Sequence, residues 1–314
     1  MRFAPTDWCV VLGGSSGFGL ATATKLAEHG MSCLIVHRDR RGAMARIEPE
    51  FARIAATGVS VVTRNVDALD AAVREETLDA LAEALARSGG RVRVLLHAIA
   101  FGNLKLLAPE RPAERAAAPA LARALGVDDA TLGAAADALF AEGIDGLAPL
   151  AAPPVYSSSS ILDEEDFART IHAMGTSLVG WSRALLDRGL FAADARVFGL
   201  TSEGNAVAWK GYAAVAAAKA ALESVARAMA VELAPYGIRT NIVQPGVTDT
   251  PALRAIPGSA QLAAQARSRN PFRRLTTPRD VANVIYLLAT DEAAWINGAL
   301  IRVDGGEHVS GLGA

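Results

Sequence analysis

Short apolar runs alternate with longer stretches of helical periodicity along the chain. The runs rich in apolar and β-branched residues predict strands at residues 8–12, 32–37, 59–63, 92–98, 195–201, 238–243 and 299–303. The stretches between them predict helices that end near residue 29 and then span 42–57, 68–87, 163–188, 210–234 and 278–290. Because strands that alternate with helices form parallel sheets covered on both faces, the pattern predicts an α/β fold. We expect a doubly wound parallel sheet of about seven strands.

One segment interrupts this alternation. Residues 103–160 lie between a predicted strand and the helix that should follow it, and they hold six of the chain's 14 prolines. The part from 115 to 142 is rich in Ala and Leu and predicts two short helices. We interpret residues 1–314 as a single domain with this insertion after the fourth strand, at the rim where ligands bind in such folds. Two roles for the insertion stay open: a surface elaboration that adds oligomer contacts, or a lid or carrier-docking element.

Composition narrows the class of protein. Hydrophobic residues make up 51% and charged residues 20%, which is typical of globular chains, and the net charge of −2 provides no general basic field for nucleic acid or anionic lipid. The only two cysteines, Cys9 and Cys33, lie in apolar runs, which excludes a disulfide scaffold, and five scattered His show no metal-ligand spacing. No signal core or spanning apolar run is evident. We therefore expect a cytoplasmic protein that binds no metal, nucleic acid or membrane.

A glycine-rich loop joins the first predicted strand to the first helix. Glycines there let the backbone approach a phosphate, and the helix N-terminus favours negative charge. The alternative is a tight turn that needs glycine only for its positive φ. At the first strand of a βαβ series, the loop predicts a Rossmann-type dinucleotide site at Gly13, Ser15, Ser16, Gly17, Phe18 and Gly19.

The end of the second predicted strand bears on the choice of cofactor. In such folds an acidic residue here usually selects the free 2′-hydroxyl of the adenosine ribose, whereas Arg accommodates a 2′-phosphate. Arg38 follows His37 directly, and Arg40 and Arg41 come next, which favours NADPH. Asp39 among them keeps NADH possible.

Tyr212 and Lys219 are candidate acid–base residues. They lie seven residues apart in one predicted helix, so both side chains should point to the same side. A Tyr phenol has an ordinary pKa of about 10, and a nearby ammonium lowers it toward a useful range. The alternative is that Tyr212 is an ordinary interface residue.

Further motifs carry a family resemblance. Together with the glycine loop, Tyr212 and Lys219, the pair Pro245-Gly246 and the terminal stretch 303–306 resemble the short-chain dehydrogenase/reductases over nearly the whole chain except the insertion. In the commoner branch the Tyr lies four residues before the Lys, where this chain has Val215. The Tyr-x6-Lys spacing and the stretch His97-Ala98-Ile99-Ala100 resemble the branch that contains the enoyl-acyl-carrier-protein reductases.

The displaced Tyr has a physical meaning in this resemblance. Three residues correspond to about 4.5 Å along a helix axis. In an enoyl thioester the hydride goes to Cβ while charge develops on the more distant thioester oxygen, where stabilisation is needed. The resemblance therefore implies that Tyr212 stabilises the enolate and that Lys219 holds the nicotinamide ribose and lowers the Tyr pKa. Ser202 stands where many enoyl reductases have a second Tyr and the commoner branch a substrate-orienting Ser. It is either a donor to the substrate oxygen or a strand-end Ser that bonds backbone.

The resemblance also implies further contacts. It assigns cofactor binding to His37, Arg38, Asn65, Val66, His97, Ala98, Lys219, Pro245, Gly246, Thr248 and Thr250. Residues 251–269 should form a mobile substrate-binding segment. The arginines in and just after it suit a phosphopantetheine phosphate or an acidic carrier protein, unless they are simply solvated: Arg254, Arg267, Arg269, Arg273 and Arg274.

These features lead to one principal hypothesis: reduction of the C=C bond of an enoyl thioester with NADPH or NADH, the acyl group being linked to acyl carrier protein or coenzyme A. The alternatives are an NADPH-dependent carbonyl reductase or alcohol dehydrogenase of secondary metabolism, and a catalytically silent cofactor-binding protein. Residues 210–234 are apolar around most of the predicted helix, which is typical of burial on all sides. We therefore expect a homodimer or homotetramer.

Overall fold

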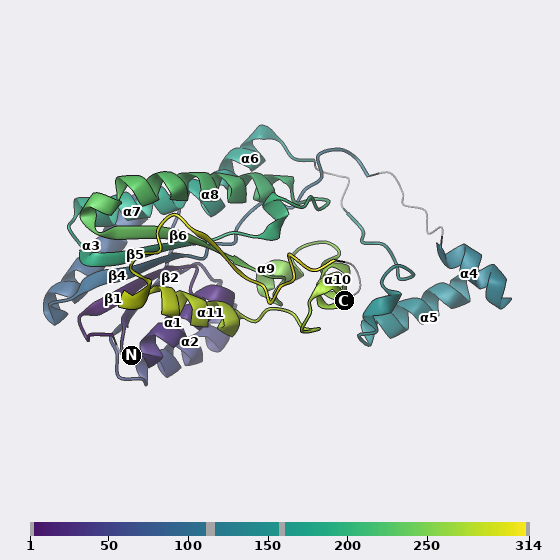
Figure 1. Ribbon diagram of the computed structural model, residues 1–314, viewed down its shortest axis with the longest axis horizontal. Helices are drawn as coiled ribbons and strands as arrows, with labels where there is room; N and C mark the ends of the chain where they lie inside the picture. The colour runs from purple at the N-terminus through teal and green to yellow at the C-terminus, as the bar shows by residue number, and fades with distance from the viewer. Residues whose placement is uncertain (1–2, 111–116, 157–160, 312–314) are drawn as a thin grey trace.

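The computed structural model describes residues 3–110, 117–156 and 161–311, and its centre is one parallel sheet (Figure 1). The strands run in the order β3-β2-β1-β4-β5-β6-β7, and each pairs in parallel with its neighbours. Chain order reverses between β1 and β4, which is the switch point where such sheets bind ligands. The predicted doubly wound fold is confirmed, with strands β1 (Asp7–Leu12), β2 (Ser32–His37), β3 (Val61–Asn65), β4 (Arg91–His97), β5 (Phe191–Leu200), β6 (Ile238–Pro245) and β7 (Leu300–Val303).

Helices cover both faces of the sheet (Figure 1). Alternate side chains of β1 enter opposite cores: Trp8, Val10 and Leu12 join one cluster, and Cys9 and Val11 join the other. The first cluster lies under α3 (Ala71–Ser88), α7 (Ser177–Asp187) and α8 (Ala213–Glu232). The second lies under α1 (Gly17–Glu28), α2 (Arg41–Ala55) and α11 (Pro278–Leu288).

The insertion forms the two short helices that its composition predicts. These are α4 (Ala117–Leu125) and α5 (Asp129–Ala141), and they project away from the sheet in Figure 1; residues 111–116 and 157–160 lie outside the described parts. The chain then returns through the 3₁₀ helix η1 (Asp145–Leu147), which packs on α10 (Ser259–Arg269). A bidentate pair between Arg267 and Asp145, with both N–O distances 2.6 Å, holds the two together.

The helix expected over residues 163–188 is interrupted. It consists of α6 (Glu164–Ile171), a π-helical turn η2 (His172–Thr176) and α7. A Cβ on Gly175 would lie 2.8 Å from the carbonyl oxygen of Ala218, so the turn packs closely against α8. Such π turns often occur at functional sites.

Helix α8 starts later than expected. The pattern predicts a helix from residue 210, but Tyr212 occupies the N-cap position with φ −111° and ψ 4°. Residues 251–269, expected to be a mobile segment, contain α9 (Pro251–Arg254) and α10. Within the described residues, no helix is both long and apolar enough to cross a membrane.

Candidate active site

A cleft of about 400 Å³ opens at the carboxyl ends of β1, β2 and β4. The glycine loop forms one side of it, and α9 with the preceding Thr250 forms another. Ten of the predicted cofactor residues line this cleft, namely Gly13, Ser15, Ser16, Gly17, Phe18, His37, Arg38, Val66, Ala98 and Thr250. The lining also includes Phe101 and Asp67, for which the sequence offered no signal beyond their place after strand ends.

The loop geometry suits a dinucleotide phosphate. Gly13 has φ +85°, and a Cβ there would lie 2.7 Å from the carbonyl oxygen of Ala98. A Cβ on Gly19 would lie 2.2 Å from the carbonyl oxygen of Gly13, so only glycine allows the loop to fold this tightly. The first turn of α1 contains no acidic residue, and the Ser16 side chain does not cap it. Its backbone N–H groups are thus available to an anion.

The ribose end of the cleft presents Arg38 rather than Asp39. The Asp39 carboxylate accepts a hydrogen bond from His37 Nδ1 at 2.9 Å. Arg38 lines the cleft, with its guanidinium 4.6 Å from the Phe101 ring centroid and 2.6 Å from an Asp67 oxygen. The Asn65 side chain holds the Asp39 backbone, accepting from the amide at 2.9 Å and donating to the carbonyl at 3.1 Å, and its contact with the cofactor stays a prediction.

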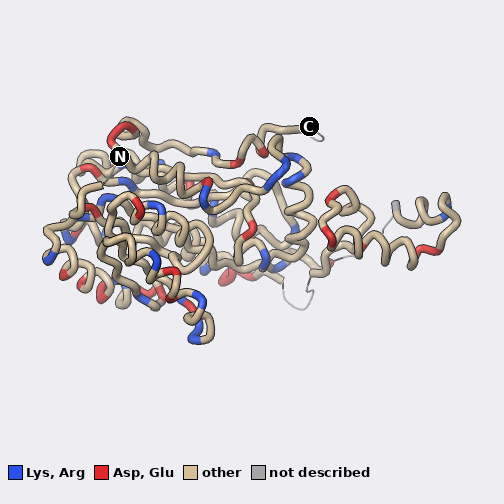
Figure 2. Tube along the Cα trace, turned by 90° about the horizontal axis from the view of Figure 1, so that it is seen from below, with Lys and Arg blue, Asp and Glu red and all other residues tan. Residues whose placement is uncertain are grey.

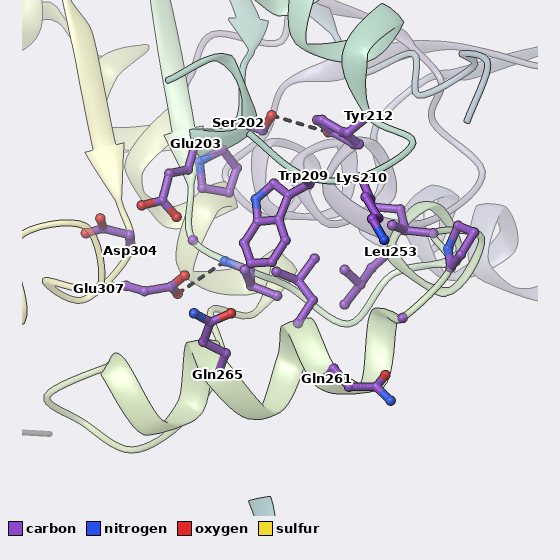
Figure 3. A pocket seen from close by; sticks show the side chains of 18 of the residues that line it. Ser202, Glu203, Trp209, Lys210, Tyr212, Leu253, Gln261, Gln265, Asp304 and Glu307 are labelled. Carbon is purple, nitrogen blue, oxygen red and sulfur yellow. Dashed lines mark hydrogen bonds between the residues drawn. The ribbon is translucent and has the colours of Figure 1, made fainter. Parts of the chain in front are cut away.

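A second pocket, of about 200 Å³, contains the two candidate hydroxyl groups (Figure 3). Ser202 Oγ and Tyr212 Oη lie 3.3 Å apart, beside Pro245 and Gly246 at the end of β6. Gly204 lets the Tyr ring lie close against the loop after β5, since a Cβ there would clash with the ring edge. Burial raises the pKa of Tyr212, and the hydrogen bond with Ser202 opposes this only in part.

Lys219 is buried behind this pocket rather than in its lining. Its Nζ donates to the carbonyl oxygen of Leu200 at 2.7 Å. Burial lowers the pKa of Lys219 to about 8, and the charge of Glu223 opposes the shift. The influences on the Tyr212 pKa in this structure are burial and Ser202, and Lys219 is not among them. Tyr212 occupies the N-cap of α8 and the Lys219 ammonium donates to the end of β5, so the lowering of the Tyr212 pKa by Lys219 stays a prediction.

His97 lies beneath the cofactor cleft, not in its lining. Ser177 Oγ donates to the carbonyl oxygen of Ala173 at 3.1 Å, so it accepts from His97 Nε2 at 2.8 Å. Burial and the charge of Lys219 lower the pKa of His97 to about 3, so the imidazole is neutral at ordinary pH. Gly19 and Thr248 likewise lie outside the lining, and Thr248 donates to the Gly246 carbonyl at 2.9 Å. Direct cofactor contacts of these residues stay predictions.

The substrate pocket contains groups that the sequence motifs did not indicate. Figure 3 shows Glu203, Asp304 and Glu307 on one side, Trp209 near the centre, and Gln261 and Gln265 projecting from α10. The insertion adds Pro154 and Tyr156 to the lining. Glu203 follows Ser202 directly, and Glu307 follows the terminal Gly-Gly pair; proximity to these motifs was the one available signal.

The arginine-rich segment is not a basic surface. Figure 2 shows Lys and Arg interspersed with Asp and Glu along the chain. Four of its five arginines form ion pairs, and Arg273 donates to the Ser268 carbonyl at 2.9 Å. The pairs are Arg254–Asp249, Arg267–Asp145, Arg269 with Glu203 and Glu307, and Arg274–Asp280. Their charges are therefore balanced locally.

Comparison with known proteins agrees with this geometry. A family model described as enoyl-(acyl carrier protein) reductase matches residues 127–308, and a model described as the KR domain matches residues 8–118. The chain belongs to the short-chain dehydrogenase/reductase family. Members of this family typically bind NAD or NADP. This bears out the expected family and nicotinamide cofactor, and it makes the chain an oxidoreductase.

Individual relatives of the family differ in their reactions. A cis-4-hydroxycyclohexanecarboxylate dehydrogenase from Sinomonas cyclohexanicum is 28% identical over 95% of this chain and 94% of its own length. A 3-oxoacyl-(acyl-carrier-protein) reductase from Vibrio cholerae is 30% identical, but over only 47% of this chain and 60% of that protein. A Burkholderia cenocepacia short-chain dehydrogenase solved in complex with NADP shares the fold, with TM-score 0.68 and 23% identity over 98% of this chain and all of that one.

Proposed function

We propose that this family member reduces the C=C bond of an α,β-unsaturated thioester with NADPH. The observation that carries the proposal is the placement of Tyr212 at the N-cap of α8, 3.3 Å from Ser202, with Val215 where the commoner branch has its Tyr. Compared with the Tyr position of the commoner branch, Tyr212 lies closer to the N-terminal end of α8. This displacement suits a substrate in which the thioester oxygen is distant from the carbon that takes the hydride. The enoyl-reductase family model, which matches more than half of the chain, supports the same reaction.

The residues divide the work as follows. When bound, NADPH would supply a hydride to Cβ of the substrate, and solvent would supply the proton that completes the reduction at Cα. Tyr212 donates a hydrogen bond to the thioester oxygen, where negative charge develops, and Ser202 shares that oxygen. Because burial raises its pKa, the Tyr212 phenol stays protonated at neutral pH and is a donor, not a base. Lys219 holds the nicotinamide ribose. To do so, its ammonium must either give up its hydrogen bond to the Leu200 carbonyl or bond the carbonyl and the ribose at the same time.

The preference for NADPH rests on the ribose end of the cleft. Asp39, which would select NADH, is engaged by His37, whereas Arg38 faces the cleft. The Asp67 carboxylate that pairs with Arg38 balances its charge, and a 2′-phosphate would compete for the same guanidinium. The NADP complex of the Burkholderia relative supports this choice.

A second candidate function is carbonyl reduction. The Ser202–Tyr212 hydrogen bond also suits a pair that binds a ketone oxygen, and two of the relatives above are named for hydroxyl oxidation or ketone reduction. In this case the hydride goes to the carbon that bears the bound oxygen, and the pair stabilises an alkoxide.

One assay separates the two functions. The purified protein is given NADPH or NADH with a short trans-2-enoyl thioester or the matching 3-ketoacyl thioester, and loss of the reduced-nicotinamide absorbance is followed. We expect oxidation with the enoyl substrate and faster turnover with NADPH. Turnover of the keto substrate alone would replace the enoyl proposal by the second candidate. Tyr212→Phe is the control, because it should strongly lower either activity.

We also propose a homodimer or homotetramer that forms through α8. Its inner side is buried, yet its outer side exposes Ala220, Ala228 and Val231 among the polar Ser224, Arg227 and Glu232. Burial of these apolar side chains by a second copy would stabilise the assembly. Solution scattering gives the test, and a monomer mass would contradict it.

A further inference from the structure

Two arginines on α10 point to different parts of the molecule. Arg267 pairs with Asp145 of the insertion, and Arg269 pairs with the rim of the candidate active site. They are two residues apart on one helix, so they leave it on different sides. Figure 3 shows α10 running along the pocket below Trp209 and the Ser202–Tyr212 pair. One ion pair therefore joins α10 to the insertion, and another joins it to the loop that follows β5 and carries Ser202.

The tie made by Arg269 joins four segments of the chain. Its Nη2 lies 2.5 Å from Glu203 Oε2 and 3.1 Å from Glu307 Oε1. Glu307 Oε2 accepts from the amide of Val247 at 3.2 Å, and Glu203 Oε1 lies 3.3 Å from His308 Nδ1. One guanidinium thus connects the loops that follow β5, β6 and β7 with α10.

Burial makes these contacts strong. The side chain of Glu307 is 2% exposed, that of Glu203 14% and that of Arg269 18%. Charge-assisted hydrogen bonds gain strength where water is largely excluded, and removal of one partner leaves the other charges uncompensated. Two carboxylates share the single guanidinium, so its loss would remove the link between Glu203 and Glu307.

We propose that Arg269 is a positioning residue: through Glu203, the neighbour of Ser202, it holds the Ser202 hydroxyl opposite Tyr212 while α10 closes the substrate pocket. The proposal rests on the proposed function, in which this hydroxyl pair binds the substrate oxygen. It also separates two tasks on α10. Arg269 sets the geometry of the reacting groups, whereas Arg267 holds the insertion and thereby the pocket wall formed by Pro154 and Tyr156.

Kinetics of three variants test this division of tasks. A small displacement of a catalytic group costs about 10²-fold, so Arg269→Met should lower kcat by about tenfold to hundredfold with KM changed by less than about threefold. Arg269→Lys should restore part of kcat, because it keeps one charged donor. The matched variant Arg267→Met should raise KM and leave kcat within about twofold. Equal losses of kcat in the two Met variants, or a change only in KM for Arg269→Met, would overturn the proposal.

Amide hydrogen exchange supplies a readout that needs no substrate. Arg269→Met should speed exchange at Asn205, Ala206 and Val207, whose amides bond back to Ser202 and Glu203. Arg267→Met should instead speed exchange near η1, at the amides of Leu147 and Ala148. Unchanged exchange at 205–207 in Arg269→Met contradicts the proposal even if wild type reduces neither thioester. Absence of wild-type turnover with faster exchange in Arg269→Met contradicts only the proposed function.

Discussion

The cofactor cleft and the substrate pocket are built in different ways. The cleft consists mainly of backbone and small side chains at the ends of β1, β2 and β4, and the close approach of Gly13 and Gly19 shapes it. The pocket draws on the insertion, the loops after β5, β6 and β7, and α10, and ion pairs hold these segments together. A site made of local backbone geometry carries a local sequence motif, whereas a site assembled from distant side chains carries motifs for only part of its lining, here Ser202, Tyr212 and Pro245-Gly246.

This contrast extends to the charges. In the cleft, Arg38 and its ion-pair partner Asp67 both belong to the lining. In the pocket, Arg269 is shared by two carboxylates that arrive from different strand ends. We therefore expect changes in the cleft to alter cofactor affinity and selectivity, and changes in the pocket to alter the chemical step.

The largest effect should come from the hydroxyl pair in the pocket. Tyr212→Phe removes the donor to the developing oxyanion, so kcat should fall by about 10²- to 10³-fold. NADPH affinity, measured by nucleotide fluorescence, should stay within about twofold, because Tyr212 lies in the pocket and not in the cleft. Ser202→Ala should cause a smaller loss. A Tyr212→Phe variant with the wild-type rate would contradict the assignment of the chemical step to the substrate pocket.

The next largest effect should come from the glycine loop. Gly19→Ala places a Cβ 2.2 Å from the Gly13 carbonyl oxygen, so the loop must shift. We expect NADPH binding at least about tenfold weaker and a free energy of unfolding lower by about 1–3 kcal/mol. The measurements are nucleotide titration and chemical denaturation.

Gly42→Ala is the matched control for this loop. No atom lies within 4 Å of a Cβ at Gly42, which lies in the first turn of α2, so affinity and stability should be kept or improved. Equal losses in both variants would show that the close approach in the loop does not matter for binding.

A more selective effect is expected at the ribose end of the cleft. Arg38→Gln removes the cation that lines the cleft. The KM for NADPH should therefore rise by about tenfold, which corresponds to the loss of one charge-assisted hydrogen bond. KM for NADH should change by less than about twofold, and the ratio of the two kcat/KM values is the measurement. A parallel rise for both cofactors would mean that Arg38 shapes the cleft without reading the phosphate.

The smallest effect at neutral pH should come from Lys219. Burial disfavours its ammonium and lowers its pKa to about 8, so kcat/KM should fall as the pH rises through this value. Lys219→Arg keeps its charge, and its basic limb should move upward by more than one pH unit even if the rate is lower. A pH–rate profile that is flat up to about pH 9.5 would contradict the assignment.

The same shift affects stability. The pKa of Lys219 is lower in the folded protein than the unfolded value of about 10.4, so the buried ammonium opposes folding below about pH 8. This penalty decreases as the pH rises from about 8 to about 10.4, where the group is neutral in both states. In Lys219→Met the penalty is absent, so the gain in unfolding free energy over wild type should be larger at pH 7 than at pH 10.

Much of the fold was predictable from the chain because its signals are local. The apolar runs at 32–37 and 238–243 coincide with strands β2 and β6 to within two residues, and the Ala- and Leu-rich middle of the insertion forms α4 and α5. The errors occur where packing overrides periodicity. Residues 163–188 form two helices around a π turn, because Gly175 allows a close approach to α8.

The candidate site was predictable to a smaller extent. Ser202 and Tyr212 come together as the resemblance implies, but Tyr212 precedes α8 and Lys219 turns to Leu200. Helical spacing alone predicted the Tyr212 and Lys219 side chains on one face. The spacing contains no information on where the helix begins or on which carbonyl accepts a hydrogen bond from the Lys219 ammonium.

The sequence by itself determined the parallel α/β architecture, the glycine loop and the identity of the polar groups at the strand ends, since hydrophobic periodicity and glycine conformation act over a few residues. Only the tertiary structure decided which charges meet. Arg269 and Glu203 are 66 residues apart, and Arg267 and Asp145 are 122 apart. Ion pairs depend on distance and burial in the folded chain, and an arginine-rich segment therefore becomes a set of internal ties instead of a basic surface.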